Sequence, residues 1–117
     1  MAGMFRFFRL PALVTASVLL SSISVQAGYV SFPQWRQMSE GERSAYIAGA
    51  FDAYLAFSQA YGPTAEHYMK CVQKLNMPQG LLSSNVFSFA AARPALHGQN
   101  VPGIMIQYLY QACGTPP

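Results

Sequence analysis

The sequence predicts an all-α protein: a small four-helix bundle, stapled by a disulfide, that follows a cleaved signal peptide. Three observations predict this fold class. Apolar residues recur with helical spacing through residues 39–113, and no stretch alternates convincingly with the period of a strand. Capping residues, Gly and Pro separate the periodic stretches. Cys71 and Cys113 lie in two different expected helices, so a bond between them would staple the bundle.

Residues 1–27 have the order of charge and hydropathy that is typical of a secretory signal peptide. Two arginines and no acid precede the apolar stretch 10–25, and small side chains stand just before the expected cleavage point after Ala27. The rival interpretation is an uncleaved membrane anchor, but the apolar stretch is shorter than the ~20 residues that a spanning helix needs. We therefore expect a periplasmic or secreted protein with no stable membrane anchor after cleavage.

The segment that follows, residues 28–38, shows no clear period and contains Pro33. We expect it to form an irregular leader ahead of one helical domain, residues 39–117, because a chain of this length builds a single small core. The leader is nevertheless rich in aromatic side chains that are expected to dock on this core: Tyr29, Phe32 and Trp35.

The domain begins with a capping box. The Ser39 hydroxyl can accept from the third backbone amide of a helix, and the Glu42 carboxylate can reach back to the amide of the cap. A helix should follow over about residues 40–60. Gly62 and Pro63 should end it, since neither residue favours continuation of a helix.

Three further helices are expected. The first starts near Thr64, the second starts at Pro78 and ends before Pro94, and the third runs from about Pro102 to Cys113. Helical spacing turns these side chains inward: Tyr68, Cys71, Val72 and Leu75 in the first, and Leu82, Val86, Phe89 and Ala90 in the second. The third is apolar nearly all round and should be the most buried.

Two short segments complete the expected bundle. Residues 95–100 are polar and should form the connection that leads into the last helix. Gly114 is placed to end that helix in a left-handed conformation, and the two prolines at positions 116 and 117 prevent its continuation.

The stretch YIAGAFDAY, residues 46–54, divides the first long helix into two faces. The bulky face is suited to a core: Tyr46, Ile47, Ala50, Phe51, Tyr54 and Phe57. The other face is flat: Ala45, Gly49, Asp52, Ala56 and Gln59. A glycine inside a helix costs about 1 kcal/mol relative to alanine, so we expect another segment to approach Gly49 closely.

Asp52 admits two interpretations. In the first, the flat face packs against another segment of the chain and Asp52 satisfies a helix end. In the second, Asp52 takes part directly in the binding of a partner. We favour the first interpretation, because single acidic residues on helix faces are usually structural or solvated.

The two cysteines are expected to form a disulfide, Cys71–Cys113, because exported proteins fold in an oxidising compartment. Such a cross-link would contribute about 4 kcal/mol to stability. The competing interpretation is a metal site, since His67 precedes Cys71 by four residues and His97 is available. The usual zinc spacings are missing, so we expect neither a metal nor any other cofactor.

Composition and motifs argue against several classes of function. Two of the seven basic residues lie in the expected signal peptide, and the remaining five nearly balance the four acids, so we expect no nucleic-acid partner. Asp52 has no second carboxylate at a suggestive spacing, and the serines lie in no nucleophile motif. A disulfide would consume the thiol of a Cys–His pair. We therefore expect a protein that is not an enzyme.

The segment YIAGAFDA, residues 46–53, resembles the Tyr-Ile-x-Gly-x-x-Asp-Ala signature of the Tai-like proteins, which are immunity proteins against type VI secretion amidases. The signature positions are Tyr46, Ile47, Gly49, Asp52 and Ala53. The similarity extends to Cys113, with Arg93-Pro94 where family members often have His-Pro, but the additional cysteine pair of the family is missing.

This resemblance implies an exported, non-enzymatic protein that binds a cell-wall amidase effector in the periplasm and blocks its active-site cleft. The contact residues of such proteins vary and are not carried over. Exposed polar connections are the physical candidates for partner binding: Glu66, His67, His97 and Gln99.

Two other functions fit a short exported helical protein. One is a periplasmic chaperone similar to the HdeA-type acid-stress proteins, favoured by the seven tyrosines but opposed by the few acids available to titrate. The other is a structural subunit of an envelope assembly that inserts residues 29–35 into a neighbour. The aromatic residues are more simply explained by a core and a homodimer face.

Overall fold

The computed structural model describes residues 30–60 and 62–117, which form five α-helices and one short 3₁₀ helix. The elements in chain order are α1 (Phe32–Arg36), α2 (Glu40–Gln59), α3 (Pro63–Lys74), α4 (Gln79–Ala91), η1 (Pro94–Leu96) and α5 (Val101–Cys113). The described part contains no strand, only an isolated bridge between Ser31 and Asn100. The predicted all-α class is therefore confirmed, while the predicted signal peptide and Tyr29 lie outside the described residues.

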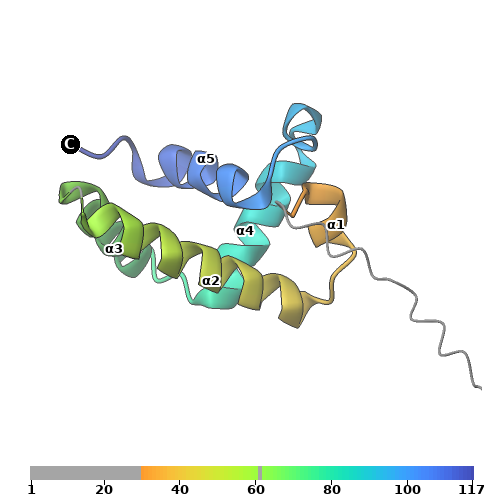
Figure 1. Ribbon diagram of the computed structural model, residues 1–117, viewed down its shortest axis with the longest axis horizontal. Helices are drawn as coiled ribbons and strands as arrows, with labels where there is room; N and C mark the ends of the chain where they lie inside the picture. Colours follow the sequence, from red (N-terminus) through yellow and green to blue (C-terminus); the bar gives the residue numbers. More distant parts are fainter. Residues whose placement is uncertain (1–29, 61) are drawn as a thin grey trace, which may run out of the picture.

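The long helix α2 organises the bundle. It packs mainly against α3 and α4, and α5 lies against α2, α3 and α4 (Figure 1). One end of the molecule holds α3 and the C-terminus, and the other holds α1 and η1 (Figure 1). No helix in the described ranges combines the length and hydropathy required to cross a membrane.

The core contains two side chains from the segment that we expected to be irregular. Phe32 and Trp35 are 2% and 0% exposed, and both rings contact the ring of Phe87 in α4. The expectation that residues 28–38 are irregular is wrong over Phe32–Arg36, which form α1. Pro33 does not break this helix, because it stands in the first turn, where a helix tolerates proline. Residues 30–38 thus belong to the same folded unit as the rest.

The predicted start of α2 is confirmed. Ser39 Oγ accepts from the amide of Glu42 at 3.2 Å, and Glu42 Oε2 accepts from the amide of Ser39 at 2.9 Å. Two other predicted boundaries differ in detail. Pro78 is the N-cap of α4 rather than a residue of its first turn, and Gly114 has a positive φ of 76° with an extended ψ of 173°, outside the left-handed helical region.

Two side chains predicted to face inward are exposed. Leu75 is 48% exposed because it follows the last residue of α3, and Phe57 is 71% exposed near the C-terminal end of α2. Within the predicted stripe of α3 only Tyr68 is fully buried. The connection 95–100 is not simply a polar loop, since the side chain of Leu96 is buried in the core. Asn100 is the N-cap of α5, and its side-chain oxygen accepts a hydrogen bond from the amide of Gly103.

The predicted disulfide is confirmed. Cys71 and Cys113 are bonded, with an S–S distance of 1.98 Å and a Cα–Cα distance of 5.7 Å. The bond joins the last turn of α3 to the last residue of α5, across a sequence separation of 42 residues. It therefore holds the C-terminal end of the bundle together.

Candidate functional site

The outer side of α2 is lined by small residues. We call it the small-residue face and define it by five exposed positions: Ala45, Gly49, Asp52, Ala53 and Ala56. At Gly49, no heavy atom of the described residues lies within 4 Å of the point where a Cβ would stand. The expectation that another segment of this chain approaches Gly49 is therefore wrong for the described part of the chain.

The opposite side of α2 explains why this face is left in solvent. Ile47 is fully buried, and Tyr46, Phe51 and Tyr54 pack against the core around it. Bulky side chains bury more apolar area than Ala and Gly, so this side turns inward. The exposed residues of the small-residue face carry short side chains and no charge except that of Asp52, so this surface of the helix is flat and has few polar groups.

Asp52 does not satisfy a helix end. It lies in the middle of α2, which spans Glu40–Gln59, and its side chain is exposed. It makes no hydrogen bond or ion pair with any other residue of the described ranges. Both Gly49 and Asp52 are unfavourable inside a helix, together by roughly 1.5 kcal/mol relative to alanine. No heavy atom in the described part of the chain packs over Gly49 in return.

The five signature residues thus separate into two groups. Tyr46 and Ile47 are held by the core, and burial raises the pKa of Tyr46, an effect that the backbone of Val30 partly offsets. Gly49 and Asp52 face solvent together with Ala53. The first group explains the fold of this stretch, and the second group has no role within the described fold.

Glu66 and His67 lie near the C-terminal tail. Glu66 forms an ion pair with Lys70, with Oε1 and Nζ 2.6 Å apart. The hydrogen bond that Lys70 donates lowers the pKa of Glu66, and the positive charge of Lys70 lowers it further. His67 Nε2 lies 3.0 Å from the carbonyl oxygen of Gly114, so a protonated Nε2 donates to it. His67 therefore fastens the segment that leaves α5.

His97 and Gln99 lie at the other end of the molecule, beside η1 (Figure 1). His97 Nε2 is 2.8 Å from the carbonyl oxygen of Ala90, and its ring stacks on Phe32 at a centroid distance of 4.6 Å. Gln99 accepts a hydrogen bond from the side chain of Gln107. The four predicted partner-binding residues consequently do not form one surface, and both histidines make structural contacts.

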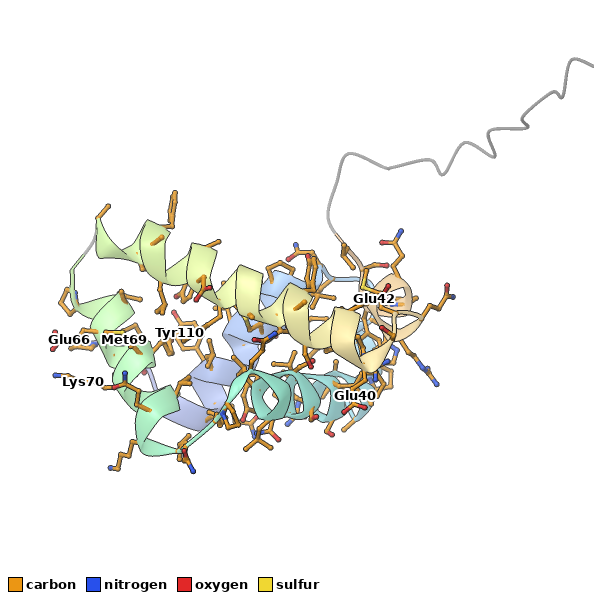
Figure 2. All side chains as sticks on the ribbon, turned by 90° about the horizontal axis from the view of Figure 1, so that it is seen from below. Glu40, Glu42, Glu66, Met69, Lys70 and Tyr110 are labelled. Carbon is orange, nitrogen blue, oxygen red and sulfur yellow. A yellow bond between two sulfur atoms is a disulfide. The ribbon has the colours of Figure 1, made fainter. Side chains whose placement is uncertain are left out.

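A surface pocket of about 340 Å³ lies over the disulfide, next to His67. Its lining combines three basic or ionisable side chains with apolar ones: His67, Lys70, Lys74, Leu75, Ala112 and the two cysteines. Figure 2 shows Glu66 and Lys70 at this end of the molecule, with Met69 and Tyr110, whereas Glu40 and Glu42 lie at the opposite end. Sequence reasoning missed this pocket, although Lys70 and Lys74 bracket Cys71 with helical spacing.

Three tyrosines form a second feature that the sequence did not indicate. The ring of Tyr68 contacts those of Tyr54 and Tyr110, at centroid distances of 5.8 and 6.1 Å. Tyr68 is 0% exposed, and its hydroxyl has no hydrogen-bond partner in the described part of the chain. Burial, reinforced by the two neighbouring phenols, raises the pKa of Tyr68 to about 12.

The described ranges hold no group of three or more His, Cys, Asp and Glu side chains arranged to bind a metal ion. Comparison of the chain with protein-family models, with curated proteins and with solved structures finds no match. Any functional conclusion therefore depends on the geometry of the chain and on the resemblance of residues 46–53.

Proposed function

We propose that this chain is an exported, non-enzymatic binding protein that uses the small-residue face of α2 to bind and block a cell-wall amidase effector. The observation that carries the proposal is the exposure of Gly49 and Asp52 in the middle of a helix that both residues destabilise. Residues that cost folding stability without an internal contact are best explained by an external one.

The chemistry of the face suits a protein partner. Without a Cβ at position 49 and with methyl groups around it, the backbone of another chain can come close to the helix surface. Asp52 then supplies two carboxylate oxygens at the centre of the contact, which can accept from backbone amides or from an arginine of the partner. The close approach at Gly49 would make the two surfaces complementary in shape, and the hydrogen bonds of Asp52 would fix the orientation of the partner.

Two further points support an exported amidase inhibitor. The outward-facing residues Gly49, Asp52 and Ala53 belong to the stretch that resembles the Tai-like signature. The disulfide is typical of proteins that fold outside the reducing cytosol. Together they support the periplasm or the exterior of the cell as the place of action.

The chaperone and envelope-assembly alternatives gain no support from a particular observation. Most of the aromatic side chains that suggested them pack within or against the core, among them Phe32, Trp35, Tyr46 and Tyr54. Of the tyrosines that the structure describes, Tyr110 is the exposed one, at 44%. An aromatic core accounts for this composition without a client or an assembly.

The proposal predicts that an amidase gene lies beside the gene of this chain, and it is tested with the product of that gene. Purified chain, oxidised and without residues 1–27, is added to that amidase in a peptidoglycan hydrolysis assay, with lysozyme as the control enzyme. We expect near-stoichiometric loss of amidase activity and no effect on lysozyme. An amidase that keeps its full rate under an excess of the chain, or the lack of any amidase gene beside it, contradicts the proposal.

A further inference from the structure

The disulfide of this protein is accessible at the surface. Cys71 and Cys113 are half-buried rather than enclosed, and both line the pocket of about 340 Å³ at the C-terminal end of the bundle. The rest of the pocket floor is apolar, with Leu75 from the end of α3 and Ala112 from α5. A small molecule that enters the pocket therefore lies against both cysteines.

The charges around the pocket are mainly positive. Lys70 and Lys74 lie on α3 on either side of Cys71, and His67 stands one turn before it. Glu66 is ion-paired with Lys70, and Pro117, the last described residue, lies with Glu66, His67 and Lys70 around an adjoining pocket. The other acidic side chains of the described residues, Glu40, Glu42 and Asp52, belong to α2. Lys74 has no acidic partner in the described ranges, so its charge is left to act on whatever occupies the pocket.

The cations stand closer in sequence to one cysteine than to the other. All of them belong to α3, the helix that carries Cys71, whereas Cys113 is the last residue of α5. Both cysteines lie in the last turn of a helix, where the negative end of the helix dipole disfavours a thiolate. Because that effect is common to both, the lysines on the helix of Cys71 are the charges in the pocket lining that can distinguish the two cysteines, by favouring a thiolate at Cys71.

We propose that the Cys71–Cys113 disulfide is a thiol-exchange site that selects small anionic thiols. The carboxylate of such a thiol binds at Lys74, with Lys70 beside it, and its sulfur attacks Cys113, so that Cys71 departs as the thiolate stabilised by the lysines. Exchange is faster when the leaving thiolate is stabilised, which fixes the direction of attack. This site is independent of whether the chain binds an amidase.

The reaction balances with two equivalents of thiol. In the first step a thiolate RS⁻ forms an S–S bond to Cys113 and the Cys71–Cys113 bond breaks, leaving a mixed disulfide and the Cys71 thiolate. A second RS⁻ attacks the mixed disulfide, forms RSSR and releases the Cys113 thiolate. Two thiols are oxidised, the protein disulfide is reduced by two electrons, and the two thiolates take up protons from water.

Exchange at this site has a structural consequence. The disulfide ties the end of α5 to α3, and the carbonyl oxygen of Gly114 just beyond it is held by His67. Tyr110, one turn before Cys113, covers the buried ring of Tyr68. Opening the disulfide therefore loosens the last turn of α5 and the covering of the tyrosine cluster.

The test compares three thiols on the oxidised chain: 3-mercaptopropionate, which is anionic, 2-mercaptoethanol, which is neutral, and cysteamine, which is cationic. Each rate is divided by the rate of the same thiol with 2-hydroxyethyl disulfide, which removes differences in intrinsic nucleophilicity. We expect the corrected rate of the anionic thiol to exceed that of the neutral one by about three-fold at low ionic strength and to lose this advantage in 1 M salt. Cysteamine should be the slowest.

Variants and mass spectrometry identify the cause. The double substitution Lys70→Gln and Lys74→Gln should remove the preference, whereas Arg36→Gln, an exposed basic residue of α1, should keep it. Acid quenching and alkylation should place the trapped adduct on Cys113. Equal corrected rates for the three thiols, a preference that survives the lysine substitutions, or an adduct on Cys71 overturns the proposal. None of these outcomes depends on an amidase.

Discussion

Gly49 has an effect on stability that its surroundings make easy to predict. It lies within the 20-residue helix α2, and the space where a Cβ would stand is open. Substitution Gly49→Ala should therefore raise the free energy of unfolding by about 1 kcal/mol, because alanine loses less backbone entropy in a helix. Urea denaturation measures this change. A lower stability would mean that some part of the chain packs on the Gly49 backbone.

Tyr68 should make stability depend on pH in the alkaline range. Its pKa of about 12 in the folded state exceeds the usual value of 10.0, so the folded state favours the neutral phenol. The resulting stabilisation is fully present below pH 10 and is lost as the pH rises from 10 to 12. Relative to the Tyr68→Phe variant, the wild type should lose roughly 2 kcal/mol across this range.

The same variant tests whether the Tyr68 hydroxyl is unpartnered. At neutral pH, Tyr68→Phe should leave stability unchanged or slightly higher, since no hydrogen bond is removed. Tyr108→Phe is the matched control, because the Tyr108 hydroxyl accepts from Asn85 at 3.1 Å and its loss should cost about 1 kcal/mol. Equal destabilisation of both variants would show that Tyr110 serves as a partner of Tyr68.

At the scale of elements, α1 is stabilised almost entirely by tertiary packing. A helix of five residues does not form alone in water, and α1 depends on the burial of Phe32 and Trp35. The indole Nε1 of Trp35 also donates to the carbonyl oxygen of Arg43 at 3.3 Å, which links α1 to α2. These two links make α1 a part of the core.

Substitution Trp35→Ala should accordingly destabilise the protein by about 3–5 kcal/mol, the usual cost of removing a buried aromatic side chain. The loss should appear as a lower denaturation midpoint followed by circular dichroism, because Trp35 is the single tryptophan of the chain and the variant has no tryptophan fluorescence. Arg36→Ala, an exposed neighbour, should change stability little. A destabilisation below about 1 kcal/mol would contradict this account and would show that residues 30–38 contribute little to the stability of the core.

Local chemistry explains which elements were predictable. Ser39 and Glu42 specify the start of α2 through contacts three residues apart, and such signals need no knowledge of the tertiary structure. Pro33 was misinterpreted because a proline can either break a helix or open one. The prediction that Leu75 faces inward was wrong for a related reason: helical periodicity does not show where a helix ends, and α3 ends at Lys74, one residue before Leu75.

The candidate site was less predictable than the helices. The spacing of residues 46–54 separates a bulky face from a flat one, but it does not tell whether the flat face is covered by another part of the chain. That outcome depends on how α3, α4 and α5 pack around α2. The pocket over the disulfide likewise requires the end of α5 to meet α3, which no local signal specifies.

For the whole molecule, the disulfide is the main constraint on the C-terminal end. It connects residues 42 positions apart, and a cross-link over a loop of that length is expected to contribute about 4 kcal/mol. This is a large part of the 5–15 kcal/mol that is typical of folded domains. The double variant Cys71→Ser and Cys113→Ser should lower the free energy of unfolding by that amount while keeping its helical circular dichroism at low temperature.

The free energy of unfolding of this double variant should be compared with that of the wild type in the presence of a reducing agent. The two should agree, because both lack the same cross-link. If the double variant is as stable as the oxidised wild type, packing of α5 on α3 alone holds this end of the bundle.

The central claim is that the small-residue face of α2 binds the partner. The most direct measurement is the affinity of Gly49→Leu for the amidase that the proposal expects to be encoded beside this chain, compared with Gly80→Leu, in which the same change is made at an exposed, open position of α4. We predict that Gly49→Leu binds at least about ten-fold more weakly although its melting temperature is no lower than that of the wild type, while Gly80→Leu binds like the wild type. Equal affinities for the two variants would contradict the account.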